Sequence, residues 1–134
     1  MSTESDILKS SHVIAIVGLS RDLTRPSCRV ADFLRNNGYK IIPVNPKETE
    51  LMGEKSYSTL SAIPESVDVV DIFRRSEEVK PVVEEAIKIK AKAVWMQEGV
   101  INKEAADLAK KAGLKVVMDK CMRKELIKVH DGGG

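Results

Sequence analysis

The chain has 134 residues, of which 43% are hydrophobic and 31% are charged, and its formal net charge is +2. This length fits one domain, the apolar content exceeds that of disordered chains, and no apolar run approaches the roughly 18 residues of a membrane-spanning helix. The small charge and the 4% aromatic content argue against a nucleic-acid partner, and two cysteines without a secretory signal in the opening residues lead us to expect a cytoplasmic protein.

The first half of the chain alternates short apolar runs with amphipathic segments. Residues 12–17 are a continuous run rich in β-branched side chains, which predicts a strand buried on both faces. A helix is predicted over residues 26–37, because Pro26 suits a first helical position and Gly38 suits the position after the last. A second strand is predicted over 40–44, and in the irregular stretch that follows, residues 50–52 could form a short strand and 58–63 a short helix.

The second half repeats this alternation. Strands are predicted over 67–73, 93–96 and 116–118, and helices over 81–90, from an Asn102 cap through 112, and over 121–129, with Ser76 as a further cap. The order predicts an α/β fold, with a doubly wound, mostly parallel, Rossmann-like sheet of five or six strands in a three-layer α/β/α arrangement. We expect one domain over residues 1–134, with its core at about 5–125 and a disordered tail from Gly132 to Gly134.

Ligands of such sheets bind beyond the carboxyl ends of the strands, so the residues that follow each strand are candidates for the site. The loop after the first strand joins a glycine, hydroxyls and arginines to a helix start, in Gly18, Ser20, Arg25, Pro26, Ser27 and Arg29. This composition predicts a phosphate site, and the alternative is a solvated loop that caps a helix. The loop is not the dinucleotide fingerprint, because Ser20 and Leu23 occupy positions that need glycine, and the chain has no P-loop motif.

Asn45, Pro46 and Lys47 follow the second strand, where an NAD site places a carboxylate against the ribose hydroxyls. A lysine there favours a ribose phosphate instead, as in NADP or coenzyme A (CoA). The alternative is that Lys47 is an ordinary surface residue.

The later strand ends carry both apolar and polar candidates. Ile72 and Phe73 could form an apolar wall, with Arg74 and Arg75 near phosphates, or could simply be core beside solvated arginines. Gln97, Glu98 and Gly99 follow the fourth strand, where Gln97 could hydrogen-bond an amide-rich ligand.

Six segments resemble the family of small stand-alone CoA-binding proteins of bacteria and archaea: VGLS at 17–20, RPSCRVA at 25–31, GYKIIPVNPK at 38–47, VDVVDIFRRSEEV at 67–79, AKAVWMQEGV at 91–100 and VVMDKCM at 116–122. That family is similar to the CoA-binding domains of the succinyl-CoA synthetase alpha subunit and of NDP-forming acyl-CoA synthetases. The resemblance implies that the chain binds CoA or an acyl-CoA, and no segment resembles the catalytic parts of the synthetases.

The resemblance also implies a role for each strand end. Pyrophosphate contacts fall to Gly18, Leu19, Ser20, Arg25, Pro26, Ser27 and Arg29, and Lys47 faces the nucleotide phosphates. Ile72, Phe73 and Arg74 line the adenosine or the pantetheine arm, and Gln97, Glu98 and Gly99 lie near that arm. Two further hypotheses stay open, namely an NADP-dependent oxidoreductase and a CoA-sensing regulatory subunit of an acyl-CoA enzyme.

The sequence offers no catalytic or metal-binding constellation, so we expect no enzymatic activity. Asp71 and Asp119 end strands, where carboxylates usually bond loop amides or an arginine. Cys28 is expected about two residues inside a helix, where the dipole and arginines would lower the pKa of its thiol. Either Cys28 or Cys121 could form a mixed disulfide with CoA.

Overall fold

A five-stranded parallel sheet forms the centre of the fold in the computed structural model, which describes residues 2–131. The strands lie in the order β2 (Lys40–Val44), β1 (Val13–Val17), β5 (Val69–Ile72), β6 (Ala93–Met96) and β7 (Lys115–Val117). Val17 pairs with Val44 on one side and with Ile72 on the other, so these strands end level with one another. β2 is added on one side of β1, whereas β5, β6 and β7 are added on the other, so the strand order switches between β1 and β5. The carboxyl edge at such a switch point is where α/β proteins bind ligands.

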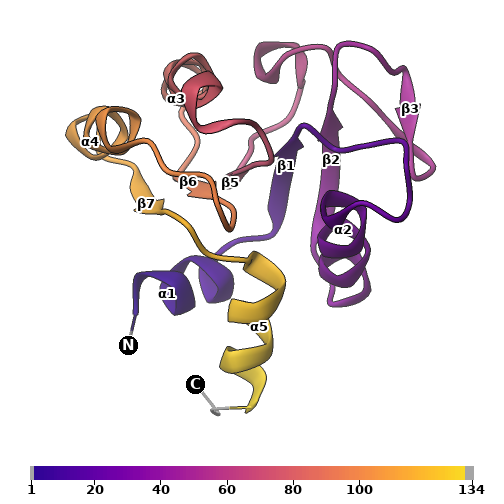
Figure 1. The fold of residues 1–134 in the computed structure, drawn as a ribbon, viewed down its shortest axis with the longest axis horizontal. Helices are drawn as coiled ribbons and strands as arrows, with labels where there is room; N and C mark the ends of the chain where they lie inside the picture. Colours follow the sequence, from indigo (N-terminus) through magenta and orange to yellow (C-terminus); the bar gives the residue numbers. More distant parts are fainter. Residues whose placement is uncertain (1, 132–134) are drawn as a thin grey trace.

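Five helices cover the two faces of the sheet (Figure 1). The helices α3 (Val79–Lys88) and α4 (Lys103–Lys111) cover one face, and α1 (Thr3–Ser10), α2 (Pro26–Asn36) and α5 (Met122–Asp131) cover the other. Each face has its own apolar core, because alternate residues of every strand point to opposite sides. The predicted three-layer, doubly wound architecture is confirmed.

The main sheet has five strands, so the option of a sixth is wrong. The segment proposed for it forms β3 (Glu50–Leu51), which pairs only with β4 (Glu54–Lys55) in a separate antiparallel hairpin. The predicted short helix nearby is a 3₁₀ turn, η1 (Leu60–Ala62). Helix α1 was not predicted; its Ser2 side chain accepts the Ser5 N–H at 3.0 Å, and its apolar side chains pack beneath α5.

The two predicted caps have different outcomes. The Asn102 side chain accepts the Ala105 N–H at 2.9 Å and caps α4 as expected. The Ser76 prediction is wrong, because a 3₁₀ turn, η2 (Ser76–Glu78), precedes α3 and the Ser76 hydroxyl instead accepts the Ile101 N–H at 2.9 Å. Ser76 therefore ties the β5 end to the β6 end. The prediction for the Gly132–Gly134 tail lies outside the described residues.

Candidate functional site

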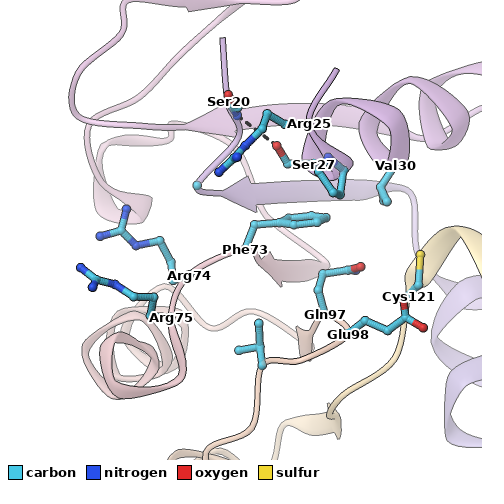
Figure 2. A pocket seen from close by; sticks show the side chains of 13 residues that line it. Ser20, Arg25, Ser27, Val30, Phe73, Arg74, Arg75, Gln97, Glu98 and Cys121 are labelled. Atoms are coloured by element: carbon cyan, nitrogen blue, oxygen red, sulfur yellow. Dashed lines mark hydrogen bonds between the residues drawn. The ribbon is translucent and has the colours of Figure 1, made fainter. Parts of the chain in front are cut away.

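Two cavities lie side by side at the carboxyl edge of the sheet, at the switch point, and share Gly18 and Arg74 in their walls. The first cavity, of about 560 Å³, opens on the α2 side, and its walls are Gly18, Ser20, Arg25, Pro26, Ser27, Val30, Phe73, Arg74, Arg75, Gln97, Glu98, Val100 and Cys121 (Figure 2). The second, of about 440 Å³, lies toward α3 and includes Pro46, Ser58, Thr59, Glu77, Glu78 and Glu85. A ligand longer than either cavity could occupy both.

The first cavity collects most of the residues that the sequence singled out. Nine of the predicted residues line it: Gly18, Ser20, Arg25, Pro26, Ser27, Phe73, Arg74, Gln97 and Glu98. Pro46 lines the second cavity, and Leu19, Arg29, Asn45, Lys47, Ile72 and Gly99 line neither. Contact with a ligand stays a prediction for all of them.

The start of α2 forms one wall of the first cavity. Arg25 is the N-cap without a side-chain cap, Pro26 follows it, and the first turn has no acidic residue. Pro26 has no N–H and the Cys28 N–H donates to the Arg25 carbonyl at 3.1 Å, so what favours an anion here is mainly the positive end of the helix dipole. The Ser27 hydroxyl accepts the Ser20 N–H at 3.1 Å, which holds the preceding loop against the helix.

Gly18 is required by packing, because its φ is +91° and a Cβ atom built on it would lie 2.3 Å from the Phe73 carbonyl oxygen. The sequence placed this glycine in the predicted phosphate site. The crowding that the structure identifies comes from the protein's own backbone, where the ends of β1 and β5 nearly touch. Any side chain here would push apart the two strands that frame the site.

Asn45 and Leu19 do not line either cavity but hold the loops that do. The Asn45 side chain donates to the Leu19 carbonyl at 2.9 Å and accepts the Lys47 N–H at 2.9 Å, so it joins the loops that follow β1 and β2. Leu19 is fully buried in the core. The Lys47 side chain is exposed, and its neighbour in the chain, Pro46, lines the second cavity.

The end of β5 contributes an aromatic ring and two arginines. Phe73 lines the first cavity, whereas Ile72 is fully buried in the core on the opposite face of the sheet. Arg74 and Arg75 pair with Glu78 at 3.1 and 3.4 Å. Desolvation opposes ionisation of Glu78, but the charges of both arginines outweigh it and lower the pKa of this carboxyl. An arriving phosphate would share these guanidinium groups with Glu78.

The end of β6 contributes the most buried polar contact of the site. Gln97 is 4% exposed, and its Nε2 donates to Asp71 Oδ1 at 2.6 Å. Asp71 is fully buried, and burial raises the pKa of its carboxyl to about 8, although the bonds from Gln97 and from the Ile72 backbone oppose the shift. Its Oδ2 has no hydrogen-bond partner among the described residues. Sequence reasoning placed Asp71 at a strand end and missed this pair; an acid inside the apolar run VVDIF was the available signal.

The neighbours of Gln97 are held by longer-range contacts. Glu98 forms an ion pair with Lys124 at 2.8 Å. The Gly99 N–H donates to Asp119 Oδ1 at 2.7 Å, so Gly99 shapes the turn. Val30 and Val100, which sequence reasoning also missed, add apolar wall; both are buried core residues, and an apolar side chain in the sequence does not show whether it also lines a cavity.

The two cysteines lie in different surroundings. Cys28 is in the first turn of α2, as expected, but it is buried and its Sγ donates to the Ser20 carbonyl at 3.0 Å. Burial raises the pKa of this thiol and the charge of Asp22 adds to the rise, which outweighs the hydrogen bonds with Ser27 and Ser20, so the predicted lowering is wrong. Cys121 is partly exposed and lines the first cavity, and a mixed disulfide there stays a prediction.

Within residues 2–131, no helix has the length and apolarity to cross a membrane. The same part of the chain holds no group of three His, Cys, Asp or Glu side chains arranged to bind a metal ion.

The sheet order and the position of the cavities define a Rossmann-like α/β protein with its candidate site at the switch point. The chain belongs to the CoA binding domain family, whose pattern matches residues 12–126. The predicted family is therefore confirmed.

Three relatives illustrate this membership. The uncharacterized protein YneT of Bacillus subtilis is 42% identical over 118 residues, which cover 88% of this chain and 87% of YneT. A hypothetical protein from Pyrococcus horikoshii has a similar structure, with a TM-score of 0.93 and 36% identity over 97% of this chain and 93% of that one. Acetate–CoA ligase (ADP-forming) I of Archaeoglobus fulgidus is 28% identical over 120 residues, which are 82% of this chain but only 18% of the ligase.

Proposed function

We propose that the protein binds CoA or an acyl-CoA in the two joined cavities. The observation that carries this proposal is the polarity of the first cavity. The guanidinium groups of Arg25, Arg74 and Arg75 gather at one end, and Gln97 and Cys121 lie at the other (Figure 2). A ligand with phosphates at one end and an uncharged amide-containing arm at the other matches this arrangement.

The residues present fit the parts of CoA in sequence. The pyrophosphate would lie at the positive end of α2, where Arg25 supplies charge. The pantetheine arm would pass Phe73 and Val100 toward Gln97, and its thiol would end near Cys121. The adenosine would occupy the second cavity, with its 3′-phosphate toward Lys47, which follows the lining residue Pro46 in the chain. Membership of the CoA binding domain family supports this assignment.

The proposal assigns binding and no reaction to this chain. The relative that is an acetate–CoA ligase is matched over only 18% of its length, so its activity does not transfer to the present chain. A role as a CoA-sensing subunit of an acyl-CoA enzyme is compatible with binding and stays a prediction. An NADP-dependent oxidoreductase is the competing hypothesis that the binding experiment must separate.

Isothermal titration calorimetry with CoA, 3′-dephospho-CoA and NADP tests the proposal. We expect CoA to bind most tightly, dephospho-CoA more weakly, and NADP most weakly of the three. Lys47→Glu should weaken CoA binding by about 1 kcal/mol or more if the side chain contacts the 3′-phosphate. Lys110→Glu, on the exposed face of α4, is the matched charge control.

Two results would contradict these assignments. If CoA does not bind, or NADP binds more tightly, the proposed function is wrong. If CoA binds but Lys47→Glu and Lys110→Glu lower its affinity equally, Lys47 acts only through the overall charge and does not contact the 3′-phosphate.

A further inference from the structure

Asp71 lies in the middle of the sheet, directly behind the first cavity. It pairs in register with Ile16 of β1 and with Trp95 of β6, and its side chain points to the face that α2 and α5 cover. Among the described residues it is the only acidic side chain that is buried. Burying a carboxyl between apolar strands costs folding free energy. A role that an apolar residue could not fill would account for an acid at this position.

Within residues 2–131, the side chain that hydrogen-bonds to Asp71 is that of Gln97, from the neighbouring strand end. A carboxyl oxygen that accepts a hydrogen bond holds the NH₂ end of the Gln97 carboxamide toward the sheet. The carboxamide oxygen is then directed into the open space between Phe73 and Cys121, as Figure 2 shows. The cavity thereby acquires one fixed hydrogen-bond acceptor in a largely apolar wall.

We propose that Asp71 is a positioning residue, which holds Gln97 so that its carboxamide oxygen accepts a hydrogen bond from an amide N–H of the pantetheine arm. The inference rests on the proposed function and adds to it the protein group, the Gln97 carboxamide oxygen, that distinguishes the amide-containing pantetheine arm from a plain alkyl chain. A hydrogen-bond acceptor in an apolar wall selects ligands that have a donor opposite the Gln97 oxygen. Any other ligand would leave this oxygen buried and unpaired.

A carboxyl group suits this role better than an amide. At pH 7 the neutral carboxyl carries one O–H, which the observed bond leaves on Oδ2, whereas an asparagine at position 71 would carry two N–H donors on one atom. Asparagine therefore gains more from donating to the Gln97 oxygen, which would turn the Gln97 carboxamide over and present NH₂ to the cavity. Because burial raises the pKa of Asp71 to about 8, the carboxyl is largely neutral at pH 7, so the cavity floor holds no buried charge.

The test compares CoA with adenosine 3′,5′-bisphosphate, which has the 3′-phosphate and one of the two 5′-phosphates of CoA but no pantetheine arm. The variants are Asp71→Asn and Gln97→Met, the second of which keeps the side-chain length without hydrogen-bonding groups. Each should weaken CoA about three- to tenfold, the range of one net hydrogen bond, and leave the bisphosphate unchanged. Asp68→Asn is the control: Asp68 accepts N–H groups of His12 and Val13 at the opposite edge of the sheet, so it should lower stability without changing the ratio of the two affinities.

A second readout does not depend on a ligand. Gln97 is the only glutamine in the chain, so selective ¹⁵N-glutamine labelling gives a single carboxamide signal in NMR spectra. Its NH₂ protons should exchange slowly with water in the wild type and faster in Asp71→Asn, because the bond to Asp71 is replaced by alternative orientations. Because a loss of global stability also speeds exchange, Asp68→Asn is the control here too: it should leave the Gln97 signal slow to exchange under conditions where the protein stays folded.

The outcomes distinguish a failure of the proposed CoA binding from a failure of the role proposed for Asp71. If the wild type binds neither ligand, the proposed function fails and the inference fails with it. If the wild type binds both but the variants keep the wild-type CoA affinity, or lose both ligands equally, the inference alone is overturned. If Asp71→Asn does not fold, Gln97→Met and the wild-type exchange rate decide the matter.

Discussion

Replacing Asp71 by asparagine removes a titratable group from the apolar interior. The variant should therefore lack the loss of stability that Asp71 causes in the wild type as pH rises. The folded-state pKa of Asp71 is raised to about 8 from an ordinary value of 3.8. Between these values the folded chain keeps a proton that the unfolded chain releases, so stability falls as pH rises and the loss is complete above the folded-state pKa. The slope approaches about 1.4 kcal/mol per pH unit, so a rise from pH 5 to pH 7 should favour Asp71→Asn over the wild type by about 3 kcal/mol.

Urea denaturation at a series of pH values, followed by the fluorescence of the single tryptophan, Trp95, measures this difference. The comparison isolates Asp71, because the other ionisable groups titrate alike in both proteins. Ile16 and Trp95, its partners in register, carry no charge. Asp107→Asn, on the exposed surface of α4, should give a curve parallel to that of the wild type. Parallel curves for Asp71→Asn, or a wild type that gains on the variant as pH rises, would refute the reasoning.

Two further predictions concern the loop between β1 and α2 and the two thiols. Gly18→Ala should lower the free energy of unfolding by about 1–3 kcal/mol more than Gly38→Ala in urea denaturation, because both glycines have positive φ but only at Gly18 would a Cβ meet backbone; equal losses would contradict this. A chromogenic thiol reagent should react quickly with Cys121 and slowly with Cys28, whose buried thiol has a raised pKa, and rapid reaction of Cys121→Ser would show the assignment wrong.

The strands and their order along the chain could be predicted because a parallel strand buried on both faces leaves a continuous apolar run in the sequence. The segments 13–17 and 93–96 have this pattern, and 69–72 has it except at Asp71. Helix α1 escaped prediction because its eight residues carry little apolar periodicity, and it is stabilised by packing against α5 and β7. The β3–β4 hairpin was not predicted, because strands of two residues are too short for their sequence to show with which strand they pair.

For the site, the sequence by itself determined the chemistry of each strand end: an arginine-rich helix start after β1, an aromatic ring with two arginines after β5, and a carboxamide after β6. These are local properties, since each group is covalently placed just beyond the strand that carries it. Only the tertiary structure decided which of these side chains share a cavity and which support it. Asp71 and Gln97 are 26 residues apart and come within 2.6 Å because β5 and β6 lie side by side. The environment of Cys28 depends likewise on chain that folds over it, so its burial, which decides the direction of its pKa shift, is a property of the assembled core.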